Sequence, residues 1–291
     1  SRGSPRPSPA LIHQARPSAS RAGRKPRPQM DRPADQKPAQ GPKWQQEMAQ
    51  ILHEVNQSNT PILGGKKTVY FVRHAQSRSN VAKAKMESRN FLESAEGAAS
   101  LLRVGFNAPL SDEGRRQLLS VRPHAQSLCG DLEAVFFSPL QRAHDTALAL
   151  FGDGDASMDG GLRPPAGKVW RSARVLKEQR PKEHAQRLLP FCAPNIMDIR
   201  VQGLLQFLAA LPFQRFALVG HSIFFRTVLR EMGVETYLSN AHIYQAEICI
   251  SPERGDLTCS SYQLVAAPRT PGVEAGEETP VDNEVMTDPE N

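Results

Sequence analysis

The sequence contains few cysteines, and none of them lies in a metal-binding pattern. Its 291 residues include only four widely spaced cysteines, with no Cys-x-x-Cys pair or Cys/His pairing. This spacing lacks the signature of the usual zinc sites. In a chain of this length it favours four free thiols in a reducing, intracellular compartment over a disulfide framework. The four are Cys129, Cys192, Cys249 and Cys259.

Long apolar runs are also missing. No stretch approaches the roughly 18 consecutive apolar residues that a membrane-spanning helix needs, which excludes such a segment. The carboxylates do not gather into a cluster that could hold magnesium. We therefore expect no metal ion, no cofactor and no membrane partner.

The charge is concentrated at the two ends of the chain. Residues 1–43 carry ten Lys/Arg and two Asp/Glu, whereas residues 266–291 carry one Arg and seven acidic residues. The basic end lacks aromatic residues to stack on bases, which argues against nucleic acid as a partner.

Both ends lack the apolar content that folding requires. We expect disorder over 1–41 and over 266–291, with one folded domain over 42–265 between them. The Arg-, Ser- and Pro-rich start, which opens at Ser1, is typical of an organellar transit peptide but shows no amphipathic periodicity. The alternatives for this segment are a disordered extension or the end of a fragment. The expected compartment is the cytoplasm, with plastid or mitochondrion if the segment is a transit peptide.

Within the expected domain, short apolar runs alternate with segments of helical periodicity. Strands are expected over 68–72, 134–137 and 216–220, a less apolar strand over 169–176, and a hairpin over 245–264. Helices are expected over 42–57, 112–128, 139–151, 197–211 and 223–232. Pro123 lies inside 112–128 and should kink or split that helix. The alternation predicts an α/β protein, a three-layer α/β/α sandwich around a mostly parallel sheet.

Charged and polar side chains follow the strands at the point where each ends. Ligands bind at this edge of a parallel sheet. Arg73 and His74 follow the strand at 68–72, and Arg142 follows the strand at 134–137. Glu178 follows the less apolar strand at 169–176, and His221 follows the strand at 216–220. Arginine presents a planar fork of donors that matches phosphate oxygens. A neutral imidazole can attack phosphorus, a second can stabilise transition-state charge, and a carboxylic acid can protonate a leaving alkoxide. These residues therefore predict phosphoryl transfer without a metal.

Five short motifs, in order along residues 67–264, resemble those of the histidine phosphatase superfamily, the phosphoglycerate mutase-like fold. They are an Arg-His motif with Ser and Asn three and six positions after the His (Arg73, His74, Ser77, Asn80), a helix start (Leu110, Ser111, Gly114), a Ser-x-Leu-x-Arg-Ala-x-x-Thr-Ala motif (Ser138, Leu140, Arg142, Ala143, Thr146, Ala147), a Leu-x-Glu motif (Leu176, Glu178) and a Gly-His pair (Gly220, His221). Each motif alone is weak, but five in the same order are specific. Ala75 stands where the family has Gly, which removes only the freedom to take a positive φ.

The resemblance implies a role for each matched residue. It implies that His74 is phosphorylated, that Arg73, Arg142 and His221 bind the phosphoryl group with help from Asn80, and that Glu178 acts as the acid and then as the base that activates water. We add Ser77 and Ser222 to the substrate-binding candidates. The expected partner is a small phosphorylated substrate or a phosphoprotein.

Two other functions use the same fold. A mutase would be expected to carry an Asn-Glu-Arg-His-Tyr-Gly stretch at the acid and an aromatic residue before Asn80, and this chain has neither. A non-catalytic binding scaffold is disfavoured because all five catalytic positions are filled. We therefore expect a phosphatase. The insertion at 81–106, which carries Lys83, Lys85, Arg89 and Arg103, is expected to form a helical lid.

Overall fold

The computed structural model describes residues 41–58, 65–88, 90–105, 107–154, 161–178, 196–251 and 256–269. The chain from Gly41 onward forms one compact unit, and the description below concerns that unit alone. Most of the two ends predicted to be disordered, 1–41 and 266–291, lies outside the described residues; Gly41 and 266–269 are described, and Ala266 is the last residue of a strand.

A sheet in the order β3-β2-β4-β1-β5-β6 lies at the centre of the unit. The strands are β1 (Gly65–Arg73), β2 (Ala134–Phe137), β3 (Val169–Ser172), β4 (Arg215–Gly220), β5 (Ile243–Ile250) and β6 (Leu257–Ala266). The first four in this order run parallel. β5 pairs antiparallel with β1, and β6 antiparallel with β5. The predicted mostly parallel sheet and the C-terminal hairpin are confirmed.

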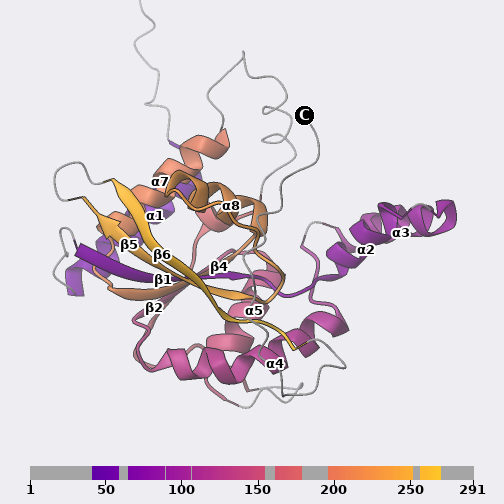
Figure 1. Cartoon of the computed structure of the whole chain (residues 1–291), viewed down its shortest axis with the longest axis horizontal. Helices are drawn as coiled ribbons and strands as arrows, with labels where there is room; N and C mark the ends of the chain where they lie inside the picture. The colour runs from indigo at the N-terminus through magenta and orange to yellow at the C-terminus, as the bar shows by residue number, and fades with distance from the viewer. Residues whose placement is uncertain are drawn as a thin grey trace, which may run out of the picture. The chain divides into compact units, whose positions relative to one another are not determined.

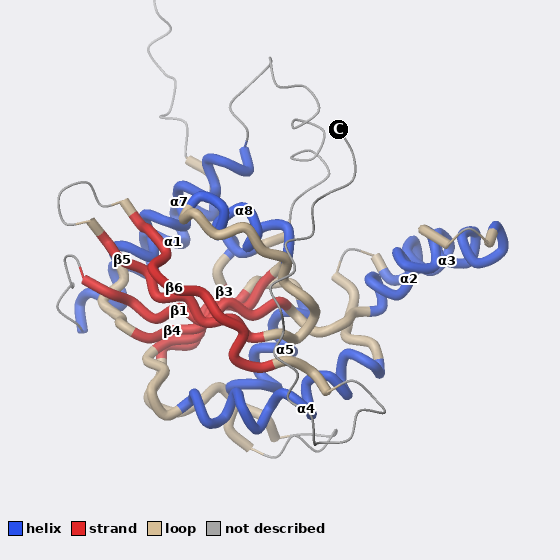
Figure 2. The backbone as a smooth tube through the Cα atoms, in the orientation of Figure 1, coloured by secondary structure: helices blue, strands red, loops and turns tan. Residues whose placement is uncertain are grey.

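Helices cover both faces of the sheet, as Figures 1 and 2 show. On one face lie α1 (Lys43–Ser58), α7 (Ile196–Ala210) and α8 (Ser222–Glu231), and on the other α4 (Asp112–Cys129) and α5 (Gln141–Phe151). Strand periodicity explains the two layers. Along β1, Val69 and Phe71 point into the core under α7 and α8, whereas Tyr70 and Val72 point into the core over α4 and α5. The predicted three-layer sandwich is confirmed.

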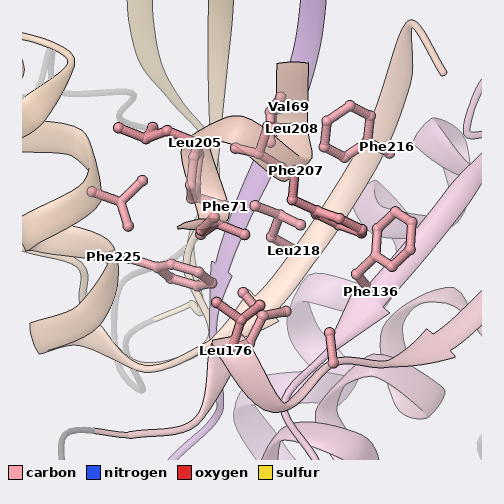
Figure 3. Packing of buried hydrophobic residues seen from close by; sticks show 14 of the residues in the cluster. Val69, Phe71, Phe136, Leu176, Leu205, Phe207, Leu208, Phe216, Leu218 and Phe225 are labelled. Carbon is pink, nitrogen blue, oxygen red and sulfur yellow. The ribbon is translucent and has the colours of Figure 1, made fainter. Parts of the chain in front are cut away.

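Aromatic side chains fill the core between the sheet and α7 and α8 (Figure 3). Phe71 of β1 meets Phe225 of α8 edge to face, with ring centroids 5.3 Å apart. Phe136 of β2 meets Phe207 of α7 in the same way at 5.4 Å. Each such pair adds about 0.5–1.5 kcal/mol to the gain from burial. This packing fixes the strand ends relative to the first turn of α8.

Two predictions about local structure need correction. The strand expected over 169–176 ends at Ser172, and a 3₁₀ turn, η1 (Arg174–Leu176), follows. Leu176 is thereby turned into the core, which places the next residues at the edge of the sheet. Of the kink or split expected at Pro123, the split is wrong, because α4 runs through this residue as one helix. Proline removes one helical hydrogen bond, and burial of Val121 and Ala125 on either side against the sheet offsets that loss.

The insertion forms two helices, α2 (Arg78–Met86) and α3 (Phe91–Val104), which pack against each other to one side of the sheet (Figure 1). They approach closely at Gly97, where a Cβ would lie 2.5 Å from the backbone nitrogen of Met86. The helical character of the insertion is confirmed, and its role as a lid stays a prediction.

The expectations about the cysteines and about membrane-spanning helices can be compared with the structure only over the described residues. Cys129, Cys249 and Cys259 carry free thiols, whereas Cys192 lies outside the described residues. None of the described helices is long and apolar enough to cross a membrane.

Candidate active site

The carboxyl ends of three neighbouring parallel strands bring the site together. His74 follows β1, Ser138 follows β2 and His221 follows β4. The backbone nitrogen of His74 donates to the Gly220 carbonyl at 3.0 Å. The rings of His74 and His221 come to lie 5.0 Å apart between centroids.

The imidazole of His74 is held in one tautomer. Its Nδ1 lies 2.7 Å from the carbonyl oxygen of Ala75. A carbonyl only accepts, so Nδ1 carries the proton and Nε2 keeps its lone pair. The Nε–H of Arg142 donates to that Nε2 at 3.2 Å. The arrangement presents an uncharged nitrogen nucleophile directly beside a guanidinium.

Both histidines are buried, and burial disfavours their charged forms. The side chain of His74 is nearly inaccessible, and burial together with the charge of Arg142 lowers its pKa from 6.5 to about 3. Burial, together with the charge of the nearby Arg142 guanidinium, holds the pKa of His221 well below its ordinary value. His74 is therefore neutral, and able to act as a nucleophile, at every physiological pH.

A buried arginine links His74 to the predicted acid. Arg142, 2% exposed, lies in the first turn of α5. It donates from Nη2 to Oε2 of Glu178, the residue that η1 places at the edge of the sheet. The other oxygen of Glu178 lies 3.9 Å from Nζ of Lys83, on α2. Burial lowers the pKa of Arg142 and the ion pair with Glu178 opposes that change; a guanidinium stays charged in either case.

Arg73 is held from the opposite side of the site. Its Nη1 donates to the Tyr237 hydroxyl at 3.0 Å and to the Leu238 carbonyl at 2.8 Å. Its Nε and the Nδ1 of His221 are both buried and have no hydrogen-bond partner among the described residues. The Nε–H of Arg73 is a buried donor, which is costly unless something accepts from it, and phosphate oxygens are suitable acceptors. The Nδ1 of His221 is a donor as well in the tautomer whose Nε2 accepts from the Ser138 hydroxyl.

The described residues bring no three His, Cys, Asp or Glu side chains together as metal ligands. The centre of the site consists instead of two histidines, two arginines and one glutamate. A family model described as the histidine phosphatase superfamily, branch 1, matches residues 69–251. The chain belongs to the histidine phosphatase superfamily.

Several solved structures are similar to this chain at low identity. A mycobacterial hydrolase is 18% identical with a TM-score of 0.42, and covers 71% of this chain and 100% of its own. A phosphoserine phosphatase from Entamoeba histolytica is 15% identical with a TM-score of 0.41 (67% and 96% covered). A mycobacterial glucosyl-3-phosphoglycerate phosphatase is 18% identical with a TM-score of 0.39 (68% and 96% covered). No curated protein matches the sequence. The family assignment rests on the family model.

Two residues of the superfamily's first motif shape the backbone in this structure. The Oδ1 of Asn80 accepts from the backbone N–H of Ser77 at 3.0 Å and from its hydroxyl at 2.7 Å, which closes a capping box at the start of α2. Direct contact of Ser77, Asn80 or Ser222 with substrate stays a prediction.

One departure from the superfamily motifs, Ala75, and one match to them, Gly114, have a physical basis in the structure. Ala75 stands where the family has Gly. Its φ is not positive, because Ala241 is the one non-glycine among the described residues with a positive φ. The Cβ of Ala75 therefore causes no backbone strain. The backbone nitrogen of Ala75 donates to Thr146 of α5 at 3.0 Å, which holds the segment after His74 in place. The glycine of the helix-start motif, Gly114, packs so tightly that a Cβ would lie 2.0 Å from the carbonyl oxygen of Gln76.

Sequence reasoning missed three residues that support the site, two at the histidines and one beside Glu178. The Ser138 hydroxyl lies 3.0 Å from Nε2 of His221, and Asn240 donates to the carbonyl of His74 at 2.8 Å. Arg200 is buried in α7 and donates to the carbonyl of Lys177, next to the acid, at 2.7 Å. Ser138 had a motif position and Arg200 stood out as a charge in an apolar helix. Asn240 gave no signal.

Proposed function

We propose that this protein hydrolyses phosphate monoesters through a phosphohistidine intermediate at His74, without a metal ion. The observation that carries the proposal is the state of His74. Its Nδ1 proton is engaged by the Ala75 carbonyl, its pKa is about 3, and its unprotonated Nε2 accepts a hydrogen bond from Nε of Arg142.

In the first step the substrate phosphate displaces the Glu178 carboxylate from the guanidinium of Arg142, and Glu178 takes up a proton from solvent. Arg73 and His221 supply further donors, from atoms that hydrogen-bond nothing else in the described part of the chain. Nε2 of His74 then attacks phosphorus, the bond from phosphorus to the ester oxygen breaks, and the proton of Glu178 passes to that oxygen. The product is the free alcohol and a phosphorylated His74.

In the second step water replaces the alcohol. The Glu178 carboxylate left by the first step accepts a proton from water, the oxygen attacks phosphorus, and the phosphorus–nitrogen bond breaks. Inorganic phosphate leaves, His74 is neutral again, and Glu178 releases its proton and pairs with Arg142 as before. The fixed donors of Arg142 and His221 stabilise the charge that spreads over the equatorial oxygens in both transition states.

The proposal is tested by a turnover screen against a panel of phosphate esters, with release of inorganic phosphate as the signal. His74→Ala is the blank, and His124→Ala, at an exposed position of α4, is the matched control. We expect the parent and the control to be active and the blank inactive. Quenching at short times should trap an acid-labile phosphoryl group that maps to His74. Full activity in the blank, or no adduct during turnover, would refute the proposal.

A further inference from the structure

A third cation lies beside the catalytic histidine, on the insertion. Nζ of Lys83 lies 3.9 Å from Oε1 of Glu178, whose other oxygen pairs with Arg142. The charge of Lys83 also acts at His74, where it adds to those of Arg142 and Arg73. Although α2 belongs to the insertion, Lys83 is electrostatically part of the site.

Lys83 lies on the side of the site where the alcohol part of the substrate would be. Arg142 contacts His74 and is placed to hold the transferred phosphoryl group. Glu178, in the function proposed above, reaches the ester oxygen. A cation adjacent to Glu178 is therefore adjacent to the group attached to that oxygen.

Among the described residues, three cations act at His74, namely Arg73, Arg142 and Lys83. Arg200 acts in addition at His221. When Glu178 is protonated for catalysis, the phosphate dianion of a simple ester pairs with Arg73 and Arg142, and Lys83 loses its carboxylate partner. A second negative charge on the substrate would take the place of that carboxylate.

We propose that Lys83 binds a second anionic group on the substrate, a carboxylate or another phosphate a few bonds from the ester oxygen. The proposal rests on the function proposed above and narrows its substrate class. The pair of Lys83 with Glu178 is half-exposed, with 50% and 33% of the side chains accessible. Exposed pairs of this kind contribute little, so exchange of Glu178 for a substrate anion costs little. The long flexible stem of lysine lets its charge follow the anion.

The other described lysine of the insertion provides a contrast. Lys85 pairs with Glu96 of α3 at 2.8 Å, which occupies it within the hairpin. It lies on the same helix as Lys83 and carries the same charge, but its carboxylate partner belongs to α3. Lys85→Met is therefore a matched control for Lys83→Met.

The test compares esters that differ only in the second group. Values of kcat/KM are measured for the parent, Lys83→Met, Lys83→Arg and Lys85→Met. The substrates are 3-phosphoglycerate, with a carboxylate, glycerol 1,3-bisphosphate, with a second phosphate, and glycerol 3-phosphate, with a neutral hydroxymethyl group. The first two arms distinguish a carboxylate from a phosphate as the recognised group.

We expect the parent to prefer at least one doubly anionic ester over glycerol 3-phosphate by on the order of tenfold, the scale of one hydrogen bond to a charged group. Lys83→Met should abolish most of that preference, Lys83→Arg should keep part of it, and Lys85→Met should keep all of it. Added salt should reduce the preference in the parent and not in Lys83→Met.

Two results would overturn the inference: a parent that does not prefer doubly anionic esters over glycerol 3-phosphate, or a preference that survives in Lys83→Met. The proposed function would still stand in both cases if glycerol 3-phosphate is hydrolysed through the adduct at His74. If no ester is hydrolysed and no ester labels His74, the proposed function fails, and the inference fails with it.

Discussion

Burial of a neutral His74 should make the folded state sensitive to acid. The unfolded chain takes up a proton at this residue below its ordinary pKa of 6.5, whereas the folded chain does so only near pH 3. Between these values the unfolded state binds more protons, so the free energy of unfolding falls as the pH falls. The slope from this residue approaches about 1.4 kcal/mol per pH unit. Between pH 7 and pH 5 the loss is about 2 kcal/mol from His74 alone.

The measurement is urea-induced unfolding of the parent and of His74→Asn at pH 7 and at pH 5. Carboxylates and the other histidines titrate in both proteins, so the difference between the two losses isolates His74. We expect His74→Asn to lose about 2 kcal/mol less than the parent. His124→Asn, at an exposed position of α4, is the control for loss of a histidine and should lose as much as the parent. Equal losses in the parent and His74→Asn would show that folding does not shift the pKa of His74, and the argument for a neutral nucleophile would fail.

Three further predictions follow from the site and its supports. Glu178→Gln should slow alkyl phosphates by on the order of 100-fold, because the leaving alkoxide then lacks a proton donor. An activated ester such as p-nitrophenyl phosphate should still phosphorylate His74 and the adduct should accumulate; parent-like turnover of both esters would refute the role of Glu178. Excess chelator should leave the parent fully active, and loss of activity that magnesium restores would contradict a metal-free site. Gly114→Ala should destabilise the fold by about 1–3 kcal/mol, because its Cβ would overlap the carbonyl oxygen of Gln76 at 2.0 Å. Gly130→Ala is the control, since a Cβ there meets nothing within 4 Å. Equal stability of both variants would show that the backbone at Gln76 is free to shift away from the new methyl group.

Much of the fold could be predicted from local pattern. Runs such as Ala134–Phe137 are apolar at every position because a central parallel strand is buried on both faces, and β2 has these bounds. The edge strand β3 was predicted four residues too long, since half-buried residues give a weaker pattern than buried ones. The sequence left a kink and a split open at Pro123, and the helix is not split, because packing of α4 on the sheet offsets the local cost of the proline.

The identity of the central residues was also determined by the sequence. The carboxyl ends of parallel strands meet at one edge of a sheet, so residues that follow such strands meet as well. The structure brings together His74, His221, Arg142 and Glu178 in this way. Their order along the chain and the topology were sufficient to predict it.

Only the tertiary structure decided how these residues are held and charged. The tautomer of His74 depends on the orientation of one carbonyl, and its pKa depends on how fully the surrounding layers exclude water. The positions of Asn240 and of Lys83 depend on a loop and an insertion whose local sequence carries no motif. Hydrogen bonds and charge interactions act over a few ångströms in space between residues far apart in sequence. Motifs could therefore single out His74 and Glu178, whereas the fold alone determined the tautomer of His74 and the cation that lies beside Glu178.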